Sequence, residues 1–190
     1  MKPHLLLVGL GNPGSAYEES RHNAGFLALE RLSREFGVGE WKDAQKFSSI
    51  VQEARIVATP ALLVKPQTYM NLSGDAIVKL LRFYKLDAQK QLIVLCDDVD
   101  LPAGTVRLRN SGGPGTHNGL KSIVTILGEK FPRLRIGIGP QPAHQDLAAW
   151  VLSAWTREER KTIDGACEAL VPMIRSFVMD DASEEGTALC

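Results

Sequence analysis

The chain has 190 residues, no formal net charge and 44% hydrophobic residues, values typical of a soluble globular protein with one domain over residues 1–190. A neutral composition excludes a uniformly basic nucleic-acid-binding chain, so a nucleic acid would have to bind a local patch. Three cysteines without a C-x-x-C pair argue against a zinc ribbon or a disulfide framework. With no signal-peptide pattern and no stretch apolar enough to span a membrane, we expect a cytoplasmic protein.

The hydrophobic pattern predicts strands that alternate with helices along the chain. We expect a strand at 5–8, a helix at 23–36, strands at 47–54 and 61–64 separated by Thr59-Pro60, and a helix at 72–84. Further elements are expected at 92–96 (strand), 105–109 (strand), 118–127 (helix) and 134–138 (strand), and a last helix opens on the capping box Thr156-Arg-Glu-Glu159. Residues 180–190 are acidic and predicted to be frayed. The order predicts an α/β fold, a three-layer α/β/α sandwich around a mixed, mainly parallel twisted sheet.

The two most apolar strands, 5–8 and 92–96, both lead into polar loops, 12–23 and 97–104. Ligands of such sheets bind beyond the carboxyl ends of the central strands. Topology alone therefore predicts a functional site where these two loops meet.

The first loop begins with Gly9-Leu-Gly-Asn-Pro-Gly14, which matches the G-x-G-x-x-G dinucleotide fingerprint. The match fails in context, because Pro13 and a polar segment follow the strand where a helix should begin. The acidic residue expected about 20 positions further on would fall inside the helix, at Glu35. We therefore predict that these glycines turn the chain and do not cradle a dinucleotide.

His22 lies in the first polar loop and is a candidate general base, because the ordinary pKa of histidine lies near pH 7. Such a base needs a carboxylate to orient it, and Asp97 is the best placed. Asp98 and Asp100 fit turn chemistry better. Either His22 or His117 could instead be a structural histidine hydrogen-bonded to backbone.

A metal site is a second alternative, with the Asp97–Asp100 segment and one of these histidines as ligands, although no known metal-binding spacing is matched. The sequence has no G-x-S-x-G nucleophile motif, and Cys96 lies within an apolar strand, where we expect it to pack. A hydrolase built on this chain is therefore expected to activate water directly.

Four asparagines occupy loop positions and are, one by one, plausible turn or cap residues: Asn12, Asn23, Asn71 and Asn118. Together they are suited to hold a water molecule, a carbonyl or a peptide backbone, since amides donate and accept hydrogen bonds without titrating.

Basic residues concentrate between positions 101 and 140. This segment contains six basic residues and one acidic residue, Glu129; the basic residues are Arg107, Arg109, Lys121, Lys130, Arg133 and Arg135. Scattered surface charge is the ordinary explanation. The motif R-L-R, however, occurs twice, and alternate residues of a strand face the same side, so each pair could present two guanidinium groups to phosphate.

Six blocks, in order, together resemble the bacterial-type peptidyl-tRNA hydrolase family: G-L-G-N-P-G, S-R-H-N-A-G, K-P-x-T-Y-M-N-L-S-G, D-x-D-L-P-x-G, H-N-G-L-K-S and R-L-R-I-G-I-G. The resemblance implies a monomeric α/β hydrolase that cleaves the ester between a peptidyl group and the terminal ribose of tRNA, without metal, cofactor or obligate protein partner. A non-catalytic RNA-binding homologue and a metal-dependent hydrolase remain the alternatives.

By motif position, the resemblance implies catalytic roles for His22 as base, Asp97 as its orienting carboxylate, and Asn12 and Asn71 toward substrate and water. Substrate-binding roles are implied or inferred by position for Tyr17, Asn23, Tyr69, Met70, Asn71, His117 and Asn118. A tRNA-phosphate role is implied for Arg109 and Arg135 and extended to their neighbours Arg107, Lys121 and Arg133. Pro114 and Thr116 depart from the family's glycine loop and are expected to stiffen it.

Overall fold

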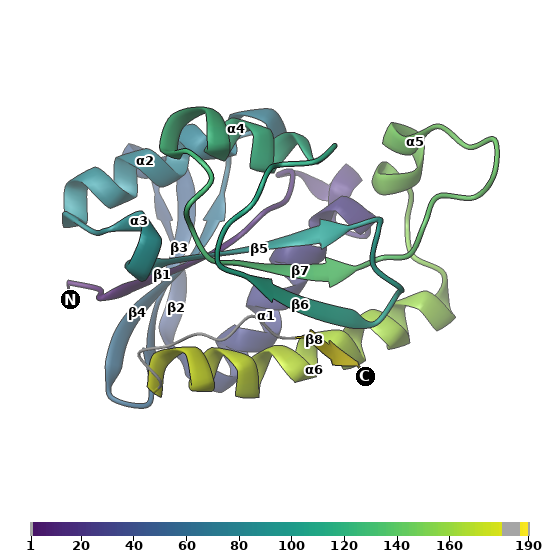
Figure 1. The fold of residues 1–190 in the computed structure, drawn as a ribbon. Helices are drawn as coiled ribbons and strands as arrows, with labels where there is room; N and C mark the ends of the chain where they lie inside the picture. The colour runs from purple at the N-terminus through teal and green to yellow at the C-terminus, as the bar shows by residue number, and fades with distance from the viewer. Residues whose placement is uncertain (1, 180–186, 190) are drawn as a thin grey trace.

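The computed structural model describes residues 2–179 and 187–189 (Figure 1). In this part of the chain one sheet has the strand order β2-β3-β4-β1-β5-β7-β6-β8. The strands are β1 (Leu5–Gly9), β2 (Gly37–Ala44), β3 (Ser49–Ile56), β4 (Thr59–Pro66), β5 (Leu92–Asp98), β6 (Thr105–Arg109), β7 (Arg133–Gly137) and β8 (Thr187–Leu189). The α-helices are α1 (Ala24–Phe36), α2 (Ser73–Tyr84), α3 (Ala88–Gln91), α4 (Asn118–Leu127), α5 (Leu147–Leu152) and α6 (Arg157–Met179). Short 3₁₀ turns are η1 (Ser15–Tyr17), η2 (Arg21–Asn23), η3 (Gln45–Phe47) and η4 (Met70–Leu72).

The centre of the sheet is parallel and its flanks are antiparallel. β1 pairs in parallel with both β4 and β5, and β5 pairs in parallel with β7. β2 and β3 continue the sheet antiparallel beyond β4, and β6 and β8 do so beyond β7. The predicted α/β class and mixed sheet are thus confirmed, and the parallel part is confined to the four central strands.

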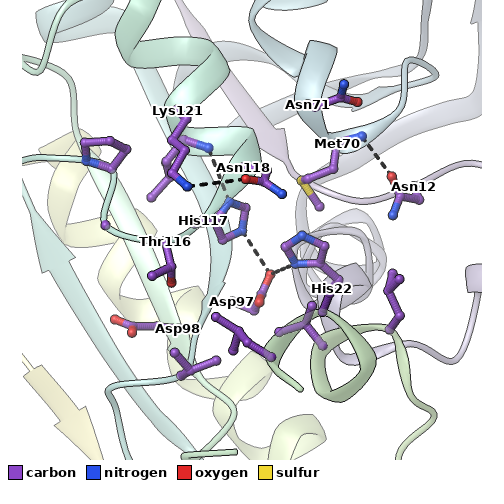
Figure 2. Close-up of a pocket in the computed structure, with 18 of the residues that line it drawn as sticks. Asn12, His22, Met70, Asn71, Asp97, Asp98, Thr116, His117, Asn118 and Lys121 are labelled. Atoms are coloured by element: carbon purple, nitrogen blue, oxygen red, sulfur yellow. Dashed lines mark hydrogen bonds and ion pairs between the residues drawn. The ribbon is translucent and has the colours of Figure 1, made fainter. Parts of the chain in front are cut away.

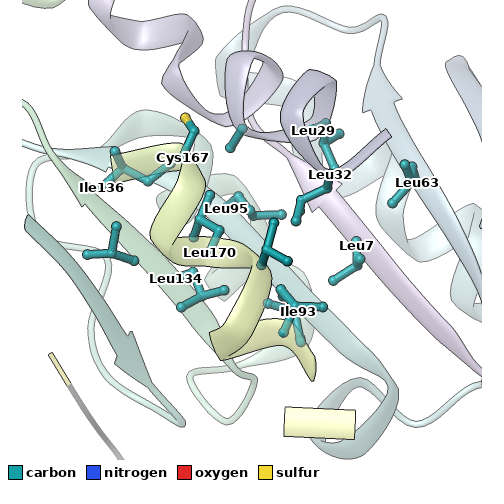
Figure 3. Packing of buried hydrophobic residues seen from close by; sticks show 14 of the residues in the cluster. Leu7, Leu29, Leu32, Leu63, Ile93, Leu95, Leu134, Ile136, Cys167 and Leu170 are labelled. Carbon is teal, nitrogen blue, oxygen red and sulfur yellow. The ribbon is translucent and has the colours of Figure 1, made fainter. Parts of the chain in front are cut away.

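Helices cover both faces of the sheet and bury alternate side chains of each strand. Leu7, Ile93 and Leu95 pack beneath α1 and α6, whereas Leu6 and Val94 pack beneath α2 and α4. Figure 3 shows the first of these layers, with Leu170 of α6 set against the strands. Burial of each such leucine or isoleucine contributes about 2 kcal/mol, so both strands that lead into the site are firmly fixed.

The elements that differ from the sequence expectation include β4, β2 and α5. Thr59-Pro60 does not break the chain but begins β4, because Pro60 sits in the first residues of the strand, where its missing N–H is tolerated. β2 was not predicted, since it is a largely exposed edge strand without clear alternation. α5 was not predicted either, since it is short and buries none of its residues.

The C-terminal end of the chain adds a strand. Residues 187–189 pair antiparallel with β6, which corrects the prediction of a frayed tail for these three positions. The rest of that prediction concerns residues 180–186 and 190, which lie outside the described residues. None of the helices that the structure describes has both the length and the hydropathy needed to cross a membrane.

Candidate active site

The site forms at the carboxyl ends of β1 and β5, which lie side by side with Gly9 opposite Leu95. α1 approaches these strands closely because two glycines meet there. A Cβ on Gly9 would lie 2.2 Å from the carbonyl oxygen of Gly25, and a Cβ on Gly25 would lie 2.4 Å from the nitrogen of Leu10. This contact brings the turn η2, just before α1, next to the end of β5.

The contact between Gly9 and Gly25 also explains why the segment 9–14 matches the dinucleotide fingerprint without acting as one. Gly14, which would be the third glycine of a dinucleotide motif, has a positive φ of 103° and open space around it. Only the three-residue turn η1 follows it. Helix packing against the strand falls instead to Gly25, so the predicted turn role of this segment agrees with the structure.

His22 and His117 both contact one oxygen of Asp97 (Figure 2). Nδ1 of His22 lies 2.8 Å from Oδ1 of Asp97, and Nε2 of His117 lies 3.0 Å from the same oxygen. All three groups are largely withdrawn from solvent, with side-chain exposures of 9% for each histidine and 2% for Asp97. Segments far apart in the sequence therefore converge on a single buried carboxylate.

His117 is also the N-cap of α4, and this fixes its tautomer. Its Nδ1 accepts hydrogen bonds from the backbone N–H groups of Gly119 and Leu120. Nδ1 therefore carries no proton, and the ring proton resides on Nε2, which donates to Asp97. His22 in turn donates from Nδ1, which leaves its Nε2 unprotonated and turned away from Asp97.

Asp97 and His22 shift each other's pKa in opposite directions. Burial alone would lower the pKa of His22, but the charge of Asp97 and its hydrogen bond outweigh burial and raise it above 6.5. Burial alone would raise the pKa of Asp97, but the two histidines hold it well below its usual range. Asp97 is thus a carboxylate at any working pH, and His22 is a base strengthened by it.

The same three side chains have ligand atoms within 4.8 Å of one another, a spacing that a metal ion could bridge. The tautomer of His117 opposes this use, because Nε2 is protonated and offers no lone pair. Binding a metal there would require the N-cap of α4 to break. In the described residues the three groups therefore form a hydrogen-bonded cluster and not a preformed metal centre.

Asn12 is held on two sides. Its Oδ1 accepts the N–H of Met70 at 2.8 Å, and its backbone N–H and carbonyl bond to the side-chain amide of Asn23. Among the described residues its Nδ2 has no partner and remains a donor at the cleft. Through these bonds the amide of Asn23, which is only 4% exposed and does not line the cleft, positions Asn12, and the substrate contact of Asn23 stays a prediction.

A cleft of about 760 Å³ opens above the cluster. His22, Asp97 and His117 lie on its floor, and Figure 2 shows Asn12, Met70, Asn71 and Asn118 around it. Tyr69 also lines it. Tyr17 does not, but its ring packs edge-on against Tyr69, with centroids 6.5 Å apart.

Polar and apolar residues line different parts of the cleft. Lys121, Asn118 and Arg135 contribute polar groups, and Nζ of Lys121 lies 3.5 Å from Oδ1 of Asn118. The apolar lining that the sequence did not predict comes from α5 and the loop after β5: Val99, Leu147, Ala148, Val151 and Leu152. Pro114, Gly115 and Thr116 of the glycine loop line it as well.

The four arginines of the two R-L-R motifs share one face of β6 and β7. Arg107 lies opposite Arg135, and Arg109 lies opposite Arg133. Their environments differ, however. Nε of Arg135 forms an ion pair of 2.7 Å with Oδ2 of Asp98, and its side chain remains 29% exposed at the cleft. Nε of Arg107 donates to Oγ1 of Thr187.

Arg133 corrects a sequence prediction, because it is only 2% exposed. Its guanidinium donates to the carbonyls of Gly112 and Glu129 at 2.7 and 2.8 Å, and it stacks on Phe131. The group is occupied by backbone carbonyls and cannot reach a phosphate. Its role is to hold the start of the glycine loop.

Asp97 and Asp98 are the last residues of β5, which runs two residues further than predicted. Successive strand residues face opposite sides, so Asp97 turns to the histidines and Asp98 to Arg135. Oδ1 of Asp98 also accepts the N–H of Asp100, the turn contact that the sequence indicated. Cys96 is fully buried, in agreement with its predicted packing role.

Comparison with known proteins identifies the family of this chain. The profile of the family described as peptidyl-tRNA hydrolase matches residues 6–189. The chain belongs to the peptidyl-tRNA hydrolase family. It is 47% identical to a peptidyl-tRNA hydrolase of Chloroflexus aggregans over 92% of this chain and 88% of that one, and 43% identical to one of Alkaliphilus oremlandii over 92% and 93%.

Solved structures agree with the sequence relatives. The crystal structure of peptidyl-tRNA hydrolase from Acinetobacter baumannii superposes with a TM-score of 0.87 at 37% identity, covering 94% of this chain and 90% of that chain. The chain is accordingly an enzyme of the peptidyl-tRNA hydrolase family, and the alternative of a non-catalytic RNA-binding homologue is not favoured.

Proposed function

We propose that this peptidyl-tRNA hydrolase cleaves the ester between the peptidyl group and the 3′-terminal ribose of tRNA with water that His22 activates. The observation that carries this is the bond from Nδ1 of His22 to Asp97, which leaves Nε2 unprotonated at the floor of the cleft. A histidine so oriented, with its pKa raised by a carboxylate, is suited to take a proton from water at neutral pH.

In this mechanism water attacks the ester directly, and no covalent enzyme intermediate forms. Water adds to the ester carbonyl carbon and gives one proton to Nε2 of His22. The carbonyl oxygen becomes an oxyanion, which Nδ2 of Asn12 stabilises. The tetrahedral intermediate collapses with loss of the ribose oxygen, which takes the proton back from His22. The products are a peptide with a free carboxyl group and tRNA with a free 3′-hydroxyl.

Asn12 is suited to this role because its amide cannot rotate freely. The N–H of Met70 fixes its Oδ1, and Asn23 fixes its backbone, so the donor nitrogen keeps one direction. A preorganised donor of this kind contributes about 3 kcal/mol to transition-state stabilisation.

Other cleft residues would contact the two halves of the substrate. We assign Asn71, Asn118, Tyr69 and Met70 to substrate binding, since all four line the cleft. Tyr17 acts through Tyr69. His117 we assign to positioning, because both of its nitrogens are occupied, one by Asp97 and one by α4.

We assign the tRNA 5′-phosphate to Arg109 and Arg135, with Lys121 and Arg107 nearby. Arg107 and Arg135 face each other on adjacent strands and, in the described part of the chain, share one carboxylate partner at the cleft, Asp98 on Arg135, so an anion would balance the remaining positive charge. Contacts to the RNA backbone do not read sequence, which suits an enzyme that accepts many tRNAs. We propose further that the enzyme acts as a monomer, as the resemblance implies, and in the cytoplasm.

The test is the turnover of N-acetyl-aminoacyl-tRNA by His22→Ala, with and without EDTA. We expect kcat to fall by about 10²–10⁴ while tRNA affinity stays unchanged, and wild-type activity to survive EDTA. His4→Ala is the matched control, since His4 is an exposed histidine at the opposite end of β1 and should retain full activity. More than about a tenth of wild-type activity in His22→Ala would refute the assignment of the base.

A further inference from the structure

The short helix α5 forms one wall of the cleft with little support of its own. Leu147, Val151 and Leu152 line the cleft, yet none of the six residues of α5 is buried. In Figure 1, α5 stands apart from both helical layers at the end of the segment that follows β7. Its position therefore depends on the packing of Val151 against the core and on a few specific polar and ring contacts.

Arg21 supplies a group of polar and ring contacts to α5 and the residues after it, from the turn that carries His22. Its guanidinium lies over the ring of Trp150 in α5, 3.7 Å from the centroid, and 5.3 Å from that of Trp155. One terminal nitrogen donates to Oγ of Ser153 at 2.6 Å and to the carbonyl of Ala154 at 2.7 Å. The residue is only 3% exposed, so these are interactions shielded from water.

The other terminal nitrogen of Arg21 binds the start of α6. It donates to Oε2 of Glu159 at 2.6 Å, and the same oxygen accepts the N–H of Thr156 in the capping box. Burial would raise the pKa of Glu159, but Arg21 and the cap hold it below its usual range. One guanidinium thus joins the end of α5, the linker at 153–156 and the first turn of α6.

His22 does not need the guanidinium to stay in place. Its own ring is held by Asp97, and the turn is closed by the bond from the N–H of Asn23 to the carbonyl of Ser20. The guanidinium itself is not part of the cleft lining. Removal of the guanidinium should therefore displace the wall more than the base.

We propose that Arg21 is a positioning residue that fixes α5 as the substrate-binding wall of the cleft. It does not touch substrate and acts on substrate affinity through α5, leaving the chemical step to His22. The proposal rests on the proposed function, and wild-type turnover with the His22→Ala control tests that function independently.

The experiment compares kcat and KM of Arg21→Lys and Trp150→Ala with N-acetyl-aminoacyl-tRNA. Lysine keeps the charge but cannot stack flat or make the forked set of bonds. We expect KM to rise by about tenfold in each variant and kcat to stay within about twofold, the signature of lost binding and not lost chemistry. In the double variant the rise in KM should be no larger than in Arg21→Lys alone, because that variant has already lost the stacking contact with Trp150.

Arg31→Lys is the matched control, since Arg31 joins α1 to α6 through Glu168 away from the cleft, and its KM should be unchanged. An unchanged KM in Arg21→Lys, or a fall in kcat alone, overturns the proposal. If Arg21→Lys does not fold, Trp150→Ala decides by itself. It keeps the pair of Arg21 with Glu159 and removes no cleft-lining residue, so a raised KM supports the proposal and an unchanged one overturns it.

Discussion

At the scale of single residues, the site depends on one carboxylate oxygen that accepts two N–H donors. His117 is held by α4 and donates to Asp97, while the ring of His22 donates to the same oxygen and packs against the ring of His117. Asp97 therefore sets both the tautomer and the basicity of His22. A change at Asp97 should be visible as a change in pH dependence as well as in rate.

We expect the kcat/KM of the wild-type enzyme to rise with pH and to reach half its plateau above pH 6.5. The sign follows because the base must be unprotonated and the pKa of His22 in the free enzyme is raised above 6.5. Asp97→Asn removes the charge that raises this pKa while burial still lowers it, so the midpoint should move to lower pH. The plateau should also fall by about 10³–10⁴, because an amide can donate to Nδ1 and leave the proton on Nε2.

Profiles of kcat/KM from pH 5 to 9 for the wild type and Asp97→Asn test whether Asp97 controls the pKa of His22. His144→Ala serves as a control, since His144 is exposed in the segment before α5 and should not change the midpoint. A midpoint that stays in place or rises in Asp97→Asn would show that Asp97 does not control the pKa of His22.

At the scale of elements, the meeting of α1 with β1 and β5 places the two halves of the site together. Gly25→Ala should lose about 3 kcal/mol of unfolding free energy, because the new Cβ meets backbone atoms of Leu10 and Leu95 at 2.4 and 2.5 Å. Turnover should fall too, since His22 would move away from Asp97. Urea denaturation measures the loss of unfolding free energy. Gly113→Ala is the control: a Cβ on Gly113 would have no atom nearer than 3.7 Å, so this variant should change the unfolding free energy by no more than about 0.5 kcal/mol. Equal stability of the two variants would contradict this account.

The same scale shows what the sequence could predict. Buried strands and amphipathic helices have clear periods, so α2, α4 and β6 fall within one residue of expectation. The placement of His22 beside Asp97 followed from the rule that neighbouring parallel strands end at one edge. α5 and β2 lack a buried face, and so no periodic signal marks them. The burial of Arg133 could not be predicted. The R-L-R alternation indicates to which side of the sheet a side chain points, but it does not indicate which other residues pack over that side.

At the scale of the whole molecule, zero net charge hides a cluster of arginines on the face of β6 and β7 beside the cleft. We expect KM for tRNA substrates to rise steeply with salt, as phosphate contacts release counterions. Arg135→Ala should lower the slope of log KM against log salt by about one. Measurements from 50 to 300 mM KCl test this. Arg175→Ala is the control, since Arg175 pairs with Glu35 between α6 and α1 and does not belong to the proposed phosphate site. An unchanged slope in Arg135→Ala would remove Arg135 from the phosphate site.

The capping of α4 by His117 limits how this enzyme can stabilise negative charge. The first free amides of a helix are a common docking point for anions, and those of Gly119 and Leu120 would otherwise open toward the cleft. His117 consumes them, so a phosphate or an oxyanion that enters the cleft is not drawn to the helix end. Competing anions such as sulfate would find the amides of Gly119 and Leu120 already occupied, and in the proposed reaction a side-chain amide stabilises the charge of the ester.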